Sequence, residues 1–194
     1  MKDTLAFQAK RAGIALSAVA ALSVLGTGNA VAASFTRADI TLDRAGSLTC
    51  TFRETGLGAN SLIVYTCGAQ ALGVVSGCYT SKNKFIGPTA VSIFKDVSNQ
   101  EHEGEPTTLI AKNNGAIGAT LTAAIPESEG GEICTEPAVE KVIAVRWCDT
   151  SLVDVTNDIV GAATGELFAQ LESTGTSVVI VPSCAELLAA PPTP

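Results

Sequence analysis

Six cysteines are the residues whose type and spacing point most clearly to chemistry: Cys50, Cys67, Cys78, Cys134, Cys148 and Cys184. No two of them lie closer than eleven positions, and the chain has one histidine, so the paired spacing of a zinc site is absent. An even number of cysteines in a protein outside the cytoplasm is typical of a disulfide framework. We therefore predict three disulfide bonds, with fifteen possible connectivities, and metal binding is the alternative.

The segment around the single histidine, His102, is the second candidate. Glu101, Glu103 and Glu105 place three carboxylates beside the imidazole, as a surface metal site or an acid/base cluster would require. Adjacent side chains on an extended chain point apart, however, and the spacing matches no metal-binding motif. We interpret residues 98–108 as a mobile, solvent-exposed loop, and we predict neither a metal nor a cofactor.

Three aspartates form another polar cluster, Asp149, Asp154 and Asp158, and a weak calcium site is one interpretation. Their spacing differs from that of the twelve-residue calcium loop. Alternation along a strand favours a second interpretation, in which Val153 and Val155 point into the core and Asp154 points to solvent. Asp149 and Asp158 would then lie in flanking turns.

No catalytic motif is recognisable in the chain. A serine triad would depend on His102, and the Gly-x-Ser-x-Gly turn that presents a nucleophilic serine is missing. A cysteine nucleophile needs a free thiol, which an even set of paired cysteines does not leave. A carboxylate pair of the glycosidase type is the remaining enzymatic alternative. We expect a protein that is not an enzyme.

Residues 1–33 have the layout of an export signal, with a basic start, an apolar run over 13–26 and small residues at 30–33. The apolar run is shorter than the roughly 20 residues that span a bilayer, although an uncleaved anchor is the alternative. We expect cleavage after Ala32 or Ala33 and a secreted or periplasmic product. Cleavage moves the net charge from −7 to −9. A negative surface disfavours nucleic acid and anionic lipid as partners.

Residues 34–190 alternate between apolar and polar positions with period two, which is typical of half-buried strands. Strand candidates are 48–53, 63–69, 117–125, 139–148, 153–155, 167–171 and 178–181, and Gly- and Asn-rich turns separate them. The pattern predicts an all-β fold: one antiparallel β-sandwich domain, Ig-like or jelly-roll-like and braced by disulfides.

The alternation also assigns individual residues. Trp147 shares its parity with Ile143 and Val145 and is expected in the core, whereas Cys148 would face the opposite side with Arg146 unless a bulge intervenes. Towards the end of the chain, Ser183 and Glu186 have the spacing of a capping box, which predicts one short C-terminal helix. Residues 191–194 are expected to form a disordered tail.

The decapeptide Leu-Thr-Cys-Thr-Phe-Arg-Glu-Thr-Gly-Leu at residues 48–57, followed by Tyr65-Thr66-Cys67 and by Cys78, carries a family resemblance. It resembles a group of exported bacterial proteins, mostly uncharacterised, that share a Leu-Thr-Cys-Thr-Phe-x-Glu-x-Gly-Leu opening and a β-rich body. The likeness covers about residues 35–80 and, loosely, 134–155. It implies a location outside the cytoplasm and, by position, a bond between Cys78 and Cys134. It implies no activity.

Three classes of function follow from these observations. The first is a secreted, non-enzymatic structural or interaction protein that acts through contacts with protein partners or with copies of itself. The second is an extracellular binding module for a glycan or a small hydrophobic ligand, although glycan sites normally use exposed aromatic faces, of which few are expected here. The third is a carboxylate-based hydrolase.

Overall fold

The computed structural model describes residues 32–99, 107–127, 133–175 and 179–192. Within these residues all strand pairs are antiparallel and a single short helix lies near the C-terminus. The all-β prediction and the predicted C-terminal helix are therefore confirmed. The elements are β1 (Ser34–Leu42), β2 (Leu48–Thr55), β3 (Leu62–Tyr79), β4 (Phe85–Ser98), β5 (Thr107–Ile110), β6 (Ile117–Ala123), β7 (Val139–Asp154), β8 (Ile159–Gln170) and α1 (Cys184–Ala189).

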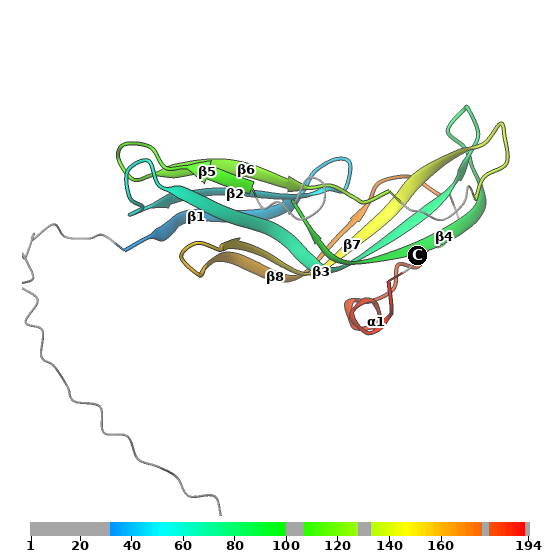
Figure 1. The fold of residues 1–194 in the computed structure, drawn as a ribbon. Coiled ribbons are helices and arrows are strands. Elements are labelled where there is room, and N and C mark those ends of the chain that lie inside the picture. Colours follow the sequence, from blue (N-terminus) through cyan, green and yellow to red (C-terminus); the bar gives the residue numbers. More distant parts are fainter. Residues whose placement is uncertain (1–31, 100–106, 128–132, 176–178, 193–194) are drawn as a thin grey trace, which may run out of the picture.

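The strands form two sheets that pack face to face (Figure 1). The smaller sheet has the order β1-β2-β6, and the larger has the order β4-β3-β7-β8, with β5 paired to the first residues of β3. The long strands β3, β4 and β7 continue past the end of the smaller sheet (Figure 1). The arrangement is the predicted sandwich, with one face of the larger sheet turned away from the smaller one.

The main core lies between the two sheets. Trp147 is fully buried there, as predicted, and its indole Nε1 donates a hydrogen bond to the carbonyl oxygen of Gly46 at 2.9 Å. The rings of Phe52 and Tyr65 pack with centroids 4.5 Å apart. Apolar side chains of both sheets therefore meet in one layer, which is the main source of stability in a sandwich.

In the larger sheet, the alternation of side chains between the two faces is interrupted at neighbouring positions of several strands. Asp96 on β4, Gln70 on β3, Asp149 on β7 and Gly165 on β8 lie next to one another in register, and we call them the pleat-shift row. Asp96 and Asp149 have φ angles of 50° and 53°. A left-handed residue inside a strand turns the following side chains to the opposite faces.

The pleat-shift row overturns one prediction about the aspartates. Beyond Asp149 the inward positions are Leu152 and Asp154, both fully buried, and Val155 is 52% exposed. Asp154 therefore points between the sheets rather than to solvent, because the left-handed backbone of Asp149 reverses the faces of β7 beyond it. Asp149 itself lies within β7 and not in a flanking turn.

A second irregularity concerns Ile143. The register between β3 and β7 shifts next to Val75, and Ile143 packs with Val75, Ala144 and Val181, in a cluster separate from that of Trp147. The expectation that Ile143 and Trp147 share a face was therefore wrong, because this bulge separates them.

Several segments differ from the sequence-based expectations. The sequence did not predict β1, β4 or β5. Residues 179–182 form no strand, although Val181 packs on the larger sheet. The proposed loop at 98–108 overlaps two strands, because β4 ends at Ser98 and β5 begins at Thr107. Asn99 is buried and accepts a hydrogen bond from the amide nitrogen of Cys67. Residues 100–106, with His102 and its acidic neighbours, lie outside the described residues, as do 1–31 and 193–194.

Candidate functional site

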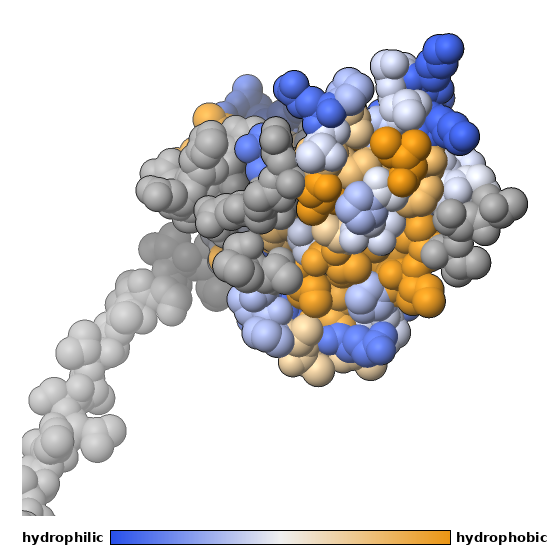
Figure 2. Space-filling view, turned by 90° about the vertical axis from the view of Figure 1, so that its right-hand side faces the viewer, coloured by the Kyte–Doolittle hydropathy of each residue, from blue (hydrophilic) through white to orange (hydrophobic). Residues whose placement is uncertain are grey.

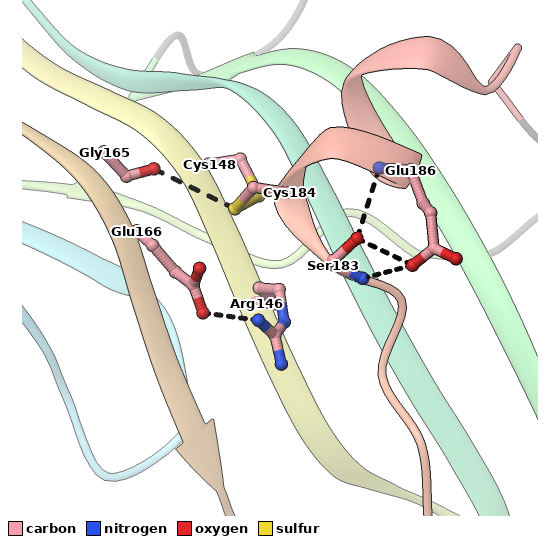
Figure 3. A network of polar contacts seen from close by, with 7 residues as sticks. All are labelled: Arg146, Cys148, Gly165, Glu166, Ser183, Cys184 and Glu186. Carbon is pink, nitrogen blue, oxygen red and sulfur yellow. Dashed lines mark hydrogen bonds and ion pairs between the residues drawn. A yellow bond between two sulfur atoms is a disulfide. The ribbon is translucent and has the colours of Figure 1, made fainter.

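The C-terminal segment covers part of the outer face of the larger sheet (Figure 3). Ser183 caps α1 in a capping box with Glu186, as the sequence predicts, and Leu187 packs over the bare backbone of Gly73. A Cβ at Gly73 would lie 2.9 Å from the terminal carbons of Leu187, so a larger residue here would displace the leucine side chain. Lys95 donates hydrogen bonds to the carbonyl oxygens of Leu187 and Leu188 at the end of the helix.

A disulfide fastens the same helix to the sheet. Cys184 at the start of α1 is bonded to Cys148 on β7, and Arg146 forms an ion pair with Glu166 nearby (Figure 3). Cys148 does face the side opposite Trp147, as the alternation predicts, and it is buried there because α1 covers it.

The other two disulfides join Cys50 to Cys67 and Cys78 to Cys134, so all six cysteines are paired. The bond between Cys50 and Cys67 connects β2 of one sheet to β3 of the other. The second bond is the one that the family resemblance implies. Three disulfides in one chain are typical of a protein outside the reducing cytoplasm.

A groove of about 680 Å³ runs along the pleat-shift row, next to α1. Polar side chains make up most of the lining of the groove. Gly165 also lines it, and the Cys184 sulfur of the disulfide lies 3.9 Å from the Gly165 carbonyl oxygen (Figure 3). The polar lining side chains are Thr66, Gln70, Asp96, Ser98, Asp149, Thr150, Ser151 and Thr164. Such a groove offers hydroxyl, amide and carboxylate groups, and no aromatic side chain lines it.

The three aspartates of the sequence analysis do not come together. Asp149 lines the groove, Asp154 is buried between the sheets, and Asp158 lies at an exposed turn between β7 and β8. In the part of the chain that the structure describes, no group of three or more His, Cys, Asp or Glu residues is arranged to hold a metal ion.

On the far side of the groove from α1, the outer face of the larger sheet carries exposed apolar side chains. We call Leu62, Ile110, Val155 and Val160 the open face; between half and two thirds of each residue is exposed. Leu62 and Ile110 are register partners on β3 and β5, while Val155 bonds through its amide to the Val64 carbonyl of β3. The open face therefore spans the strands β5, β3 and β8 and the β7–β8 turn, which contains Val155.

A second apolar area lies at the opposite end of the molecule. Figure 2 looks onto the end at which β3 turns into β4 and β7 begins, and apolar side chains gather there. Ile86 is 53% exposed and Val139 is 54% exposed. Lys82 and Lys84 lie in the connection between β3 and β4, and Lys141 lies near the start of β7, so positive charge interrupts this area.

Beneath the open face, two carboxyl groups are fully buried between the sheets. Glu54 on β2 accepts a hydrogen bond from the Tyr65 hydroxyl to Oε2 at 2.7 Å, and its other oxygen, Oε1, lacks a donor among the described residues. Asp154 on β7 is its charged neighbour. Burial raises the pKa of Glu54 to about 7, the hydrogen bond from Tyr65 lowers it, and the charge of Asp154 raises it. Burial and the Glu54 neighbour also raise the pKa of Tyr65.

Sequence reasoning missed both Gln70 and Asp96 as groove residues and Glu54 as a buried acid. The sequence does not single out Asp96 and Asp149 as left-handed residues, because aspartate adopts this conformation more often than most residues but most aspartates do not. The one available signal for Glu54 was its inward parity with Cys50 and Phe52 on the same strand.

Comparison with known proteins identifies no relative: no family model, no curated protein and no solved structure matches the chain. Among the described residues, no helix has the length and apolarity needed to cross a bilayer.

Proposed function

We propose that the protein works outside the cytoplasm as a non-catalytic interaction protein, and that the open face is its contact surface. The observation that carries the proposal is the group of exposed apolar side chains on β5, β3, β8 and the β7–β8 turn, next to a polar groove. Contact surfaces commonly combine an apolar centre with a hydrogen-bonding rim. The location rests on the three disulfides, and we expect either secretion or retention in a periplasm.

A second copy of the chain is the first partner to test, because a flat apolar surface can pair with itself through a twofold axis. Size-exclusion chromatography with light scattering, over a hundredfold concentration range, would measure the mass of the oxidised protein. We expect concentration-dependent dimers that Ile110→Lys and Val160→Lys dissociate. Ile180→Lys is the matched control, because Ile180 is 78% exposed but lies on the C-terminal segment.

Two results would count against this surface. A strict monomer over the whole range would contradict self-association. Dissociation by Val139→Lys, without an effect of Val160→Lys, would assign the contact to the area in Figure 2 instead.

A second candidate function is ligand binding in the groove, which its volume favours, since small-molecule sites commonly measure roughly 300–1,000 Å³. Hydroxyl and amide groups suit a glycan, although the lining lacks aromatic faces. A thermal-shift screen of glycans and small hydrophobic ligands tests this function, and Gln70→Trp, which would fill the groove, should abolish any response. A flat response across the panel would argue against it.

Export itself can be tested by intact mass. We expect the exported protein to begin at Ala33 or Ser34, and the oxidised mass to be about six hydrogens below that of the fully reduced chain, two for each bond. Retention of residues 1–33, or thiols that react with alkylating reagents before reduction, would contradict the expectation.

A further inference from the structure

The two buried carboxyl groups lie where the two sheets meet. Glu54 belongs to β2 of the smaller sheet and Asp154 to β7 of the larger one, and neither side chain is exposed. None of the ion pairs in the described residues includes either group. Two buried carboxylates without a cation would repel each other strongly, so the arrangement requires another source of stability.

A single proton supplies that stability. Tyr65 places the two carboxyl groups near each other, because its hydroxyl donates to Glu54 and it is the register partner of Asp154 on β7. Two neighbouring buried carboxyl groups are stable only when one of them is protonated. Glu54 Oε1 has no hydrogen-bond donor among the described residues. When Glu54 is protonated, this oxygen becomes a donor itself. The Tyr65 hydroxyl already donates to Glu54 Oε2, and Asn157 donates to both oxygens of Asp154, through its amide at 3.0 Å and its Nδ2 at 2.6 Å. Asp154 is therefore held as the acceptor of the pair.

We propose that Glu54 and Asp154 share one proton and form a pH-sensitive latch between the two sheets, closed while the proton is present and loosened when it passes to solvent. In the part of the chain that the structure describes, no lysine or arginine forms an ion pair with Glu54 or Asp154 that would compensate for this loss. Tyr65 faces it from β3 and Asn157 from the β7–β8 turn, while the register neighbours of Glu54 on β1 and β6 are Phe35 and Ile117.

Opening of the latch would first affect the β7–β8 turn. Asn157 holds this turn to Asp154, and Thr156 accepts a hydrogen bond from the amide of Val64 at 2.8 Å. The turn carries Val155 and precedes Val160, so a pH-dependent change would reach the open face. The latch does not depend on that surface being a contact site, and it would operate in an isolated monomer.

The direction of the pH dependence follows from the raised pKa of Glu54. Below the ordinary value of 4.5 the group is protonated in both the folded and the unfolded protein. Between 4.5 and about 7 the unfolded chain loses this proton while the folded protein keeps it, so stability falls as pH rises. Above about pH 7 Glu54 is ionised in both the folded and the unfolded protein, so its stabilising effect is lost and its contribution to stability no longer changes with pH.

Urea unfolding of the wild-type protein and Glu54→Gln between pH 5 and 8.5 tests the latch. We expect the folding equilibrium constant of the wild type to fall by about a hundredfold over this range. Glu54→Gln should be nearly independent of pH, because its amide donates to Asp154 at every pH. Glu140→Gln, at an exposed position of β7, is the matched control and should keep the wild-type profile. The same fall in Glu54→Gln, or no fall in the wild type, would overturn the proposal.

A measurement on the wild type covers the case in which Glu54→Gln does not fold. The infrared C=O band of a protonated carboxyl should be present in heavy water near pH 6, where exposed carboxyls are ionised, and should vanish by pH 9. A protein without this band near pH 6 would rule the shared proton out.

Discussion

The Tyr65 hydroxyl affects the pKa of Glu54, to which it donates a hydrogen bond. Its hydroxyl stabilises the ionised form of Glu54, and this hydrogen bond lowers the pKa of that carboxyl. Tyr65→Phe should therefore raise the pKa of Glu54 further and extend the pH-dependent loss of stability above about pH 7. Urea midpoints at intervals from pH 5 to 9 measure this shift.

Tyr79→Phe is the control, because the Tyr79 hydroxyl donates to the Ser173 carbonyl oxygen and not to Glu54. An identical pH profile in Tyr65→Phe and the wild type would show that the hydroxyl does not act on Glu54.

Gly115 occupies a position that no other residue fits. Its φ is +68°, and a Cβ would lie 2.1 Å from the carbonyl oxygen of Leu57. Gly115→Ala should lower the free energy of unfolding by about 2–4 kcal/mol, through backbone strain and displacement of this loop. Gly165→Ala is the matched comparison, since nothing lies within 4 Å of its Cβ position. Equal urea midpoints for the two variants would contradict the steric argument.

At the scale of elements, the left-handed backbone of Asp149 sets which faces of β7 are buried. Aspartate tolerates this conformation better than β-branched residues do, and glycine tolerates it best. We expect Asp149→Gly to change the free energy of unfolding by less than about 1 kcal/mol, and Asp149→Val to lower it by about 2 kcal/mol. Chemical denaturation measures both. An unchanged free energy of unfolding in Asp149→Val would show that the pleat shift does not depend on this residue.

Period-two patterning predicts strands best where the sheet is regular. Leu48, Cys50 and Phe52 are inward residues of β2, and the antiparallel sandwich follows from such runs together with the turns. Patterning fails beyond Asp149, where one left-handed residue reverses the faces. It also failed for β4, whose mostly half-buried or exposed positions produce no clear alternation. The groove was unpredictable for the same reason, since it lies along the pleat-shift row.

The helix α1 packs on the outer face of the larger sheet, so its detachment should affect only the structure next to it. Replacing Cys148 and Cys184 together by alanine should loosen α1, because it then contacts the sheet mainly through Leu187, which packs with Ala71, Gly73 and Ile93, and through the Lys95 hydrogen bonds. We expect faster amide hydrogen exchange in residues 184–190 and on the strand face beneath them, with β1 and β2 unchanged. Faster exchange throughout both sheets would show that the helix supports the whole fold.

At the scale of the whole molecule, two different connections hold one sheet to the other at neighbouring places. The disulfide between Cys50 and Cys67 is covalent and independent of pH, whereas Glu54 and Asp154 respond to pH. Glu54 follows Cys50 on the same strand by four residues. A covalent bond close to the carboxyl pair would keep the sheets together when the pair loses its proton, so opening should remain local in the oxidised protein.

The final prediction compares the inter-sheet bond with the bond to α1. Loop length alone ranks Cys148–Cys184 above Cys50–Cys67, because the first closes 36 residues and the second 17. This difference is about 0.7 kcal/mol in the chain-entropy model. We expect the opposite order, since both Cys50 and Cys67 are fully buried between the sheets and their replacement by alanine also leaves a cavity. Removal of Cys50–Cys67 should cost about 3 kcal/mol or more of global stability. Urea unfolding followed by Trp147 fluorescence measures it, and a smaller loss than for the Cys148–Cys184 pair would mean that loop entropy outweighs packing.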